Sequence, residues 1–244
     1  MMPLRIGVNA LFLIPGGVGG TEVYLRNLLA AFAKNPRSHQ FTVFLNKETG
    51  PDVVPAHPAF HAVQTGVIAA SRPRRIVYEQ VRLPGVAKTA KIDVLFNPGF
   101  TAPRFLHCPN VTLIHDLQHH HHPEFFKRSD LLAWRFLVWS SAQSSKRILT
   151  VSEASREDIH ATYQVPLYRI HTAEPGVEPE FFTLAPIGPE PLILCVSTLH
   201  PHKNIERLVD AFAAFRASRP EYRLILAGMP GFHGNAVQRR IHHH

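Results

Sequence analysis

The sequence has little cysteine: its 244 residues include only Cys108 and Cys195, which lie far apart along the chain. No CxxC pair occurs, so the sequence excludes a disulfide framework and a cysteine-based metal site. Such sparing use of cysteine is typical of proteins in a reducing compartment. We therefore predict a cytoplasmic protein, either free or peripheral on the inner face of the membrane.

Long apolar runs are also missing. No stretch approaches the roughly 20 consecutive apolar residues that span a bilayer. Residues 1–15 are partly apolar, but Asn9 interrupts them and no small-residue cleavage site follows. We interpret this region as a buried first strand and not as a signal peptide.

Acidic residues are outnumbered, with 18 Asp and Glu against 26 Lys and Arg, which gives a net charge of +8. An excess of positive charge attracts phosphates, whether in a nucleotide, a nucleic acid or an anionic lipid. The charge alone does not choose among these ligands.

Apolar strands alternate with helices along most of the chain, and this predicts an α/β fold with a parallel sheet covered on both faces. The helical spacing after a glycine-rich turn predicts a helix capped by Thr21. The apolar residues of 134–139, including both tryptophans, are expected in the core. The predicted strands are 5–9, 41–45, 93–96, 111–114 and 147–151, and the predicted helices begin at 21, 131 and 152.

Prolines gather near the end of this pattern and predict a domain boundary. We expect an N-terminal domain over 1–178, a linker over 179–190 and a second domain over 191–244. The second domain shows a strand at 192–196, a helix at 205–215 and a strand at 223–227. One such unit cannot cover both faces of a sheet, so this domain is predicted to be incomplete.

Several separated segments, in this order along the chain, together resemble glycosyltransferase family 4, which has the GT-B fold. The resemblance implies two Rossmann-like domains facing each other across a cleft. It also implies that the first domain holds mainly the acceptor and the second mainly a nucleotide-sugar, in retaining enzymes that need no catalytic metal. The segments are 16–22, 78–80 with 83–84, 115–117, 123–126, 151–155, 175–177 and 196–204.

The glycine-rich loop, with Gly16, Gly17, Gly19 and Gly20, follows a strand and precedes a helix. Glycines let backbone N–H groups approach a ligand closely, and a helix N-terminus favours an anion. The alternative is a tight turn without a ligand. The resemblance places this loop over the diphosphate and sugar of the donor.

His115 and Asp116 follow an apolar strand. Ligands of open parallel sheets sit outside the carboxyl ends of the strands, so this polar pair is well placed to meet a substrate. The alternative is a strand end with a structural histidine. The resemblance implies that His115 hydrogen-bonds the transferred sugar near the reaction centre, with Asp116 orienting the loop.

Two glutamates are candidates for the acceptor side, Glu79 and Glu153. Ser152 and Glu153 open a predicted helix, so capping by Ser152 explains that pair equally well. Phe100, Phe105 and Phe126 are further candidates to line the acceptor side.

Lys203 is the best single candidate for contact with the donor phosphates, because it follows a strand and lies where a helix opens. The commonest family pattern has an arginine where this sequence has Thr198, which leaves a second positive charge unassigned. The pattern over 198–204 resembles members often assigned as mannosyltransferases. We therefore expect GDP-mannose as donor, with a UDP-sugar as the second choice, and no other cofactor.

Four consecutive histidines, 119–122, suggest a metal site, but adjacent residues rarely converge on one ion. We predict no metal and interpret the run as a loop bordering the cleft, partly charged at low pH. The chain also contains no DxD, which argues against a metal-dependent GT-A site.

A basic stretch over 72–91 has only Glu79 against its six positive charges. We consider two interpretations of this stretch: a solvated helix face, and a surface that binds anionic lipid or a phosphorylated acceptor. Nucleic acid ranks last, because no aromatic interleaving or nucleic-acid motif accompanies the charge. The basic residues are Arg72, Arg74, Arg75, Arg82, Lys88 and Lys91.

We predict a retaining glycosyltransferase that moves a hexose, first mannose, from a nucleotide diphosphate-sugar to a glycan or lipid-linked acceptor. The family's later pair of glutamates, separated by seven residues, has no counterpart after Gly228. We therefore expect a chain truncated within the C-terminal domain and nearly inactive alone. The alternative from another class is a non-catalytic module that binds a glycan or an anionic lipid.

Overall fold

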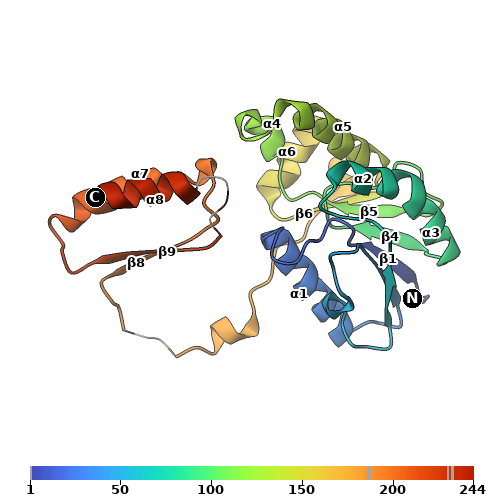
Figure 1. Ribbon diagram of the computed structural model, residues 1–244. Helices are drawn as coiled ribbons and strands as arrows, with labels where there is room; N and C mark the ends of the chain where they lie inside the picture. The colour runs from blue at the N-terminus through green and yellow to red at the C-terminus, as the bar shows by residue number, and fades with distance from the viewer. Residues whose placement is uncertain (1, 186–187, 230, 232–233) are drawn as a thin grey trace. The chain divides into compact units, whose positions relative to one another are not determined.

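The computed structural model describes residues 2–185, 188–229, 231 and 234–244. The chain divides into two compact units, Met1–Gly176 and Val177–His244, and each is described by itself (Figure 1). Residues 186 and 187, which fall in the predicted linker, lie outside the described residues. Among the described residues, no helix is both long enough and apolar enough to cross a bilayer.

The larger unit is built on a sheet of seven strands in the order β3-β2-β1-β4-β5-β6-β7. Every neighbouring pair runs parallel, which confirms the predicted α/β fold with a parallel sheet. The strands are β1 (Arg5–Asn9), β2 (Gln40–Leu45), β3 (Phe60–Gln64), β4 (Val94–Asn97), β5 (Asn110–Leu113), β6 (Arg147–Thr150) and β7 (Ile170–Thr172).

Helices cover both faces of this sheet (Figure 1). Val43 of β2 packs in one cluster with Leu29 of the first helix, while its neighbour Phe44 packs in another cluster with Leu83. Successive side chains of a strand point to opposite faces, so these two clusters lie on the two sides of the sheet. The helical segments are α1 (Gly20–Lys34), α2 (Arg72–Val77), a π-helical stretch (Tyr78–Arg82), α3 (Leu83–Thr89), α4 (Gln118–His121), α5 (Arg128–Ser144), α6 (Glu153–Tyr163) and 3₁₀ turns at Pro51–Val53, Pro123–Phe125 and Leu167–Arg169.

Several features of the larger unit differ from the sequence-based prediction. The strands β3 and β7 were not expected, because β3 is largely exposed and β7 has three residues, so neither carries a long apolar run. Helix α1 begins at Gly20 with Gly19 as its N-cap, so the predicted Thr21 cap is wrong. Gly19 has a positive φ of 58°, which glycine tolerates, and it caps the helix two residues before the predicted position.

Helix α5 buries only part of the aromatic segment 134–139. Val138 is fully buried and Trp134 packs against the same cluster, whereas Phe136 is 60% and Trp139 is 40% exposed. The expectation that the whole segment lies in the core is therefore wrong. Residues spaced three and four positions apart form the face of the helix that packs on the sheet. The residues between them point to solvent.

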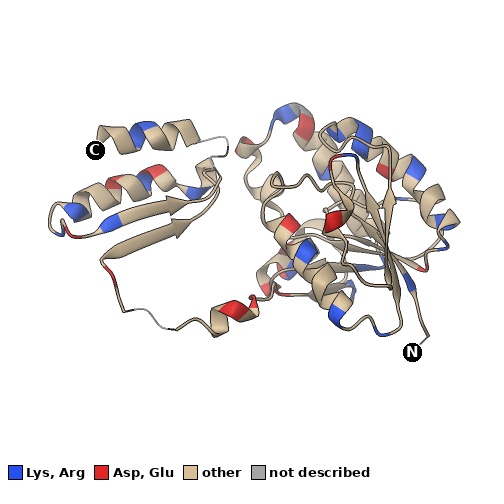
Figure 2. Ribbon diagram, turned by 60° about the horizontal axis from the view of Figure 1, so that its bottom comes forward, with Lys and Arg blue, Asp and Glu red and all other residues tan. Residues whose placement is uncertain are grey.

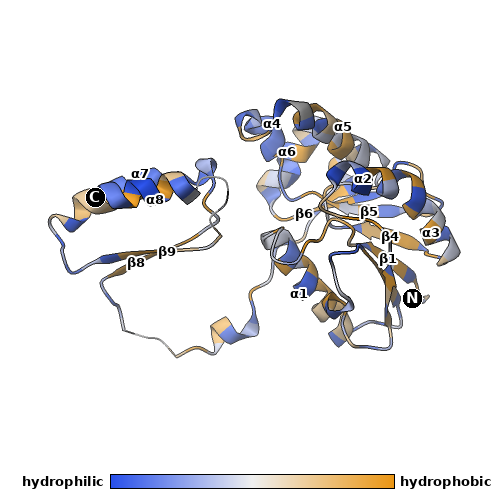
Figure 3. Cartoon of the chain, in the orientation of Figure 1, coloured by the Kyte–Doolittle hydropathy of each residue, from blue (hydrophilic) through white to orange (hydrophobic). Residues whose placement is uncertain are grey.

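The smaller unit contains one parallel strand-helix-strand arrangement and a further helix. Its strands occupy the residues predicted from sequence, and its core gathers around Ile205, Val209 and Val237. The hydropathy colouring of the ribbon marks much of both strands as hydrophobic (Figure 3). The elements are a 3₁₀ turn (Pro179–Phe182), β8 (Leu192–Val196), a 3₁₀ turn (Pro201–Lys203), α7 (Ile205–Arg216), β9 (Arg223–Ala227) and α8 (Gly234–His243).

Candidate functional site

The strand order of the larger unit reverses between β1 and β4. Open parallel sheets bind ligands outside the carboxyl ends of their strands at such a switch point. Two buried asparagines end these strands here, and Asn9 Nδ2 donates to Asn97 Oδ1 at 3.1 Å. A pair of buried amides at the edge of an apolar sheet gives this edge fixed polar groups.

Glu79 belongs to the same polar cluster at the strand ends. Its side chain is 3% exposed and its Oε2 accepts a hydrogen bond from Asn9 Nδ2 at 3.1 Å. Burial raises the pKa of Glu79, although hydrogen bonds from Thr101 and Asn9 and the charge of Arg75 oppose the rise. Glu79 is therefore a buried part of the strand-end cluster and not an exposed acid within a basic surface.

The basic stretch 72–91 likewise divides into inner and outer residues. Arg72 lies over the ring of Trp134 at 4.3 Å from its centroid, and burial lowers the pKa of both Arg72 and Arg75. The interpretation of the whole stretch as one solvated face is wrong for these two arginines. The exposed members are Arg74, Arg82, Lys88 and Lys91. Figure 2 shows lysines and arginines on several helices of the larger unit.

The glycine-rich loop connects β1 to α1 at the same edge. Gly16 and Gly19 have φ values of 70° and 58°, which residues other than glycine rarely adopt. A Cβ built on Gly16 or Gly20 would meet no atom within 4 Å, so the loop faces open space. Gly19 provides no side-chain cap, so the first N–H groups of α1 remain available to a ligand.

One carboxylate already contacts this loop. The N–H of Gly16 donates to Glu22 Oε2 at 2.8 Å, and Arg26 Nε donates to the other oxygen of Glu22 at 2.9 Å. The side chain of Glu22 is only 12% exposed. The loop is therefore held in place by the first turn of its own helix.

His115 follows β5 and lies against aromatic rings. Its ring centroid is 5.7 Å from that of Tyr24 on α1 and 5.2 Å from that of Phe100. Phe100 has a φ of 69°, a strained conformation for a residue with a side chain. The structure thus brings His115 and the helix that follows the glycine-rich loop together within one unit.

The Nε2 atom of His115 is buried and has no hydrogen-bond partner in the described part of the chain. Burial lowers the pKa of His115, against the opposing effects of Asp116 and the Pro98 backbone. The ring is therefore neutral near pH 7. A buried ring nitrogen without a partner carries a free-energy cost that a bound hydroxyl would remove.

Asp116 is exposed, and its Oδ1 accepts a hydrogen bond from the N–H of Gln118 at 3.2 Å. This bond lies at the start of α4. The contact is local to the loop that follows His115.

The four histidines occupy the short helix α4 and the residue after it, so the predicted loop is wrong. His119 donates to or accepts from the Tyr163 hydroxyl at 3.0 Å, and burial lowers its pKa to about 4. His119 therefore stays neutral at mildly acidic pH, and the charge predicted for the histidine run at low pH is not tested by this value. His121 pairs with Asp158 at 2.8 Å, and no group of three or more metal-binding side chains converges within the described residues.

Ser152 caps α6 as expected, since its Oγ accepts a hydrogen bond from the N–H of Ser155 at 3.1 Å. Glu153 is exposed, accepts a hydrogen bond from the Thr172 hydroxyl and pairs with Arg156 at 3.1 Å. These contacts account for Glu153 without a ligand. Its acceptor-side role stays a prediction.

In the smaller unit, Thr198 and Lys203 lie in the loop after the carboxyl end of β8. Lys203 is exposed and forms no ion pair within the described part of the chain. Asn204, at the N-cap of α7, has a φ of 52° and makes no side-chain cap. The loop presents a free ammonium group beside an open helix N-terminus, a combination that suits an anion.

Glycines hold this second loop against the end of β9. A Cβ on Gly228 would lie 2.2 Å from the Ser197 carbonyl oxygen, and one on Gly231 would lie 2.6 Å from the Leu199 carbonyl oxygen and 3.1 Å from the Thr198 methyl group. The two backbones therefore approach too closely for any larger residue. The glycine-rich loop and Lys203 belong to different units, so their joint contact with one ligand stays a prediction.

Some residues of the site were missed from sequence. Neither Tyr24 nor Asn97 was predicted as a site residue. A signal for Asn97 was present, because a polar residue ending an apolar parallel strand points to the ligand edge. Tyr24 carries no such signal, since its contact with His115 spans 91 positions of sequence.

Comparison with known proteins supplies the context for this geometry. Residues 18–181 match the profile of Glycosyltransferase Family 4. A curated relative, O-antigen chain mannosyltransferase B of Escherichia coli, is 27% identical over 160 residues. The match covers 61% of this chain and 42% of that relative.

Solved structures share the fold at low identity. Sucrose-phosphate synthase from Thermosynechococcus elongatus matches with a TM-score of 0.69 and 16% identity, covering 98% of this chain and 66% of its own. A glycosyltransferase from Rickettsia africae matches with a TM-score of 0.59 and 14% identity, covering 98% and 64%. These likenesses concern the fold, and they agree with the predicted GT-B architecture. Because the family profile matches about two thirds of its residues, the chain belongs to glycosyltransferase family 4.

Proposed function

We propose that this chain serves the transfer of a hexose from a nucleotide diphosphate-sugar to a glycan or lipid-linked acceptor, with retention of anomeric configuration. Family membership supports a transferase, and the E. coli mannosyltransferase supports mannose as the sugar to test first. GDP-mannose is therefore the first donor that we propose, and a UDP-sugar is the second.

The unpaired Nε2 of His115 is the observation that carries the proposal. It lies next to the strand-end edge at which parallel sheets bind ligands, and Tyr24 links it to the helix after the glycine-rich loop. A neutral imidazole can exchange a hydrogen bond with a sugar hydroxyl without adding charge. We assign His115 to the transferred sugar on this basis.

Negative charge grows on the departing nucleoside diphosphate as the glycosidic bond breaks. A fixed positive charge and the N-terminus of a helix, both aimed at that charge, lower the barrier. Lys203 and α7 offer these two groups in the smaller unit. In this mechanism the acceptor hydroxyl transfers its proton to the leaving phosphate, and no metal takes part.

Binding of nucleotides tests the role of Lys203. We expect Lys203→Ala to weaken GDP binding about tenfold, as for the loss of one charge-assisted contact of about 1.4 kcal/mol. Lys88→Ala, which removes an equally exposed lysine on α3, is the matched control and should leave the affinity unchanged. Calorimetric titration of both variants measures this, and equal GDP affinity in Lys203→Ala and the parent chain would remove Lys203 from the site.

His115 is tested by the difference between two ligands. His115→Ala should weaken GDP-mannose binding while leaving GDP binding in place, because only the first carries the sugar. A variant that loses both affinities equally would place His115 outside the sugar site.

A second candidate function is a non-catalytic module that binds a glycan or an anionic lipid. One observation favours it: the unpaired Nε2 of His115 and the open glycine-rich loop lie within one unit, where the hydroxyl groups of a glycan could bind them without a nucleotide. Affinity for a glycan without any affinity for GDP or UDP would favour the module over the transferase.

A further inference from the structure

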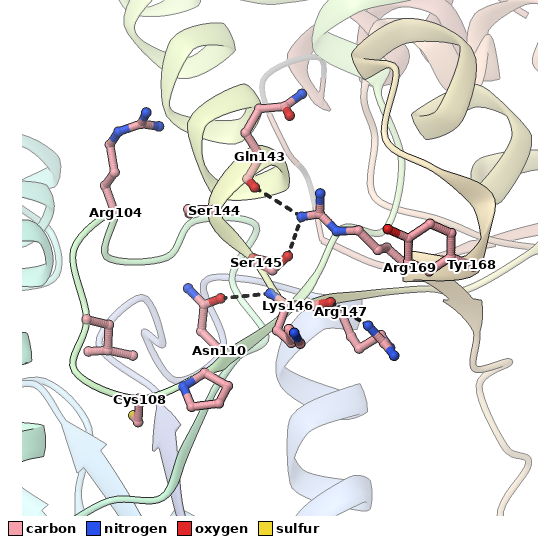
Figure 4. A pocket seen from close by; sticks show the side chains of 12 residues that line it. Arg104, Cys108, Asn110, Gln143, Ser144, Ser145, Lys146, Arg147, Tyr168 and Arg169 are labelled. Atoms are coloured by element: carbon pink, nitrogen blue, oxygen red, sulfur yellow. Dashed lines mark hydrogen bonds between the residues drawn. The ribbon is translucent and has the colours of Figure 1, made fainter.

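A pocket lies at the amino ends of three strands of this sheet, opposite the strand-end site. It has a volume of about 470 Å³, and its walls come from the segments that lead into β5, β6 and β7. Figure 4 shows Arg104 on one side and Arg147, Arg169 and Tyr168 on the other. Neither the family resemblance nor the proposed transfer uses this pocket.

The pocket is strongly basic. Its lining includes Arg104, Lys146, Arg147 and Arg169 but no aspartate or glutamate. The carboxylate of Asp93 lies close enough to affect Cys108 in the wall, but it is paired with an arginine, Arg5, at 2.7 Å. Four cations without a lining acid create a local field that favours an anionic ligand.

Two of the four cations already have structural roles. Arg169 donates to the carbonyl oxygens of Ala142, Gln143 and Ser145 at the end of α5, and Arg104 donates to the Ser140 hydroxyl at 3.1 Å. Lys146 is exposed and forms no ion pair within the described residues, and the guanidinium of Arg147 contacts only a backbone oxygen, that of Lys146. Lys146 and Arg147 are therefore the cations that can turn to a ligand.

An exposed apolar strip lies beside this pocket. Leu132, Phe136 and Trp139 are spaced four and three residues apart on α5 and are 73%, 60% and 40% exposed. Phe105 is 80% exposed, and the guanidinium of Arg104 lies 5.9 Å from its ring centroid. Arg104 thus joins the pocket to this apolar surface.

Helix α5 also runs between the carboxyl ends and the amino ends of the strands. Its 17 residues span about 25 Å. It ends in the pocket wall, where β6 begins, so its start lies towards the carboxyl edge that carries His115. A flat surface that contacts the strip would therefore run from the pocket towards the strand-end site.

We propose that this pocket binds the phosphate-bearing headgroup of an anionic membrane lipid, while the strip of Leu132, Phe136, Trp139 and Phe105 contacts the bilayer interface. Arginine and lysine are the side chains that recognise phosphate, and aromatic side chains favour the headgroup region of a membrane. The combination of a basic pocket with an apolar strip fits an amphiphile better than a free anion. The site goes beyond the proposed transfer and is distinct from the basic stretch 72–91.

Vesicle binding by the whole chain tests this site. The probes are vesicles of phosphatidylcholine alone and vesicles with about one third phosphatidylglycerol, with inorganic phosphate as a soluble anion. We expect binding to the anionic vesicles only, and a fall of about thirtyfold in Lys146→Ala/Arg147→Ala, at about 1 kcal/mol for each cation at an anionic surface. Phe136→Ser should reduce the same binding severalfold, although its side chain supports no core.

The matched control is Arg82→Ala/Lys88→Ala, which removes the same charge from the basic stretch. An equal loss in this control would overturn the proposal, as would equal binding to both kinds of vesicle or none to either. Saturable binding of inorganic phosphate at Lys146 and Arg147 without vesicle binding would also overturn it in favour of a soluble ligand. GDP titration of the same variants keeps the two proposals separate, because vesicle binding does not depend on Lys203.

Discussion

Both units of this chain contain parallel strands joined by helices, but they differ in how far their strands are buried. In the larger unit, neighbouring residues of β2 such as Val43 and Phe44 are both fully buried, on opposite faces of the sheet. In the smaller unit, Leu194 and Ile225 remain 58% and 43% exposed. The contrast shows that an apolar strand pattern predicts the strand itself, whereas burial depends on how many helices cover the sheet.

This difference also affects stability within the chain. Apolar burial is the main favourable contribution to folding, and the core cluster of the smaller unit holds three buried apolar residues among those that the structure describes. Regions with few buried contacts open at lower free energy than the rest of a protein. The larger unit should therefore hold its structure when the smaller one opens.

The largest expected effect comes from a core substitution in the larger unit. Phe41 is 1% exposed and stacks on Phe60 with ring centroids 4.5 Å apart, so Phe41→Ala should cost about 3–5 kcal/mol of unfolding free energy. Leu194→Ala, at an exposed position of β8, should change stability by less than about 0.5 kcal/mol.

Both tryptophans belong to the larger unit, so their fluorescence during urea unfolding follows that unit. Hydrogen exchange of the β8 and β9 amides follows the smaller one. Comparable losses from Phe41→Ala and Leu194→Ala would contradict the contrast between the units.

Acid should weaken the larger unit through His119. Its pKa is about 4 in the folded chain against 6.5 for the free side chain, so the unfolded state binds the proton more readily between these values. Stability from this group is fully present above pH 6.5 and falls as the pH approaches 4, by about 2 kcal/mol between pH 7 and pH 5.

The smaller unit should respond at lower pH. Hydrogen bonds from Arg240 and His244 hold the pKa of Asp210 well below its usual range, so its contribution persists until the unfolded carboxyl begins to protonate near 3.8. Unfolding midpoints from pH 7 to pH 5 test the comparison. His119→Gln should flatten the dependence in the larger unit, and an unchanged slope in that variant would assign the effect to other groups.

The smallest effect concerns the helix caps of the two units. Ser152 caps α6 with its hydroxyl, so Ser152→Ala should cost about 1 kcal/mol. Asn204 gives α7 no side-chain bond and adopts a left-handed φ, so Asn204→Gly should be neutral or slightly stabilising. Thermal unfolding of the first variant and hydrogen exchange at α7 in the second check this, and a larger loss in Asn204→Gly would reverse the ranking.

Periodicity and composition were sufficient for the backbone pattern. The parallel sheet, the bounds of β8 and β9 and the Ser152 cap follow from local spacing and from the chemistry of single residues. Periodicity and composition could not show which face of α5 turns to the sheet, because Phe136 and Trp139 are as apolar as their buried neighbours. A marginally apolar strand such as β3 is likewise recognised only when its partner strand is known.

The candidate site was less predictable than the fold. The position of His115 at a strand end was evident, but its unpaired nitrogen depends on Tyr24 and Phe100, which are distant in sequence. Glu79 was predicted on the acceptor side, but its burial beside Asn9 depends on a contact across 70 residues that the sequence does not show. The donor-side roles predicted for Gly17, Thr198 and Lys203 and the acceptor-side role predicted for Glu153 stay predictions.

The carboxylate of Glu22 has a consequence for selectivity. It uses the N–H of Gly16 and places a negative charge beside the N-terminus of α1, where the helix dipole contributes about half a positive charge. Arg26 offsets that negative charge only in part, because it also faces Asp52 at 3.6 Å. The glycine-rich loop is therefore nearly neutral as a whole, and it should discriminate in favour of uncharged hydroxyl-bearing groups over phosphates.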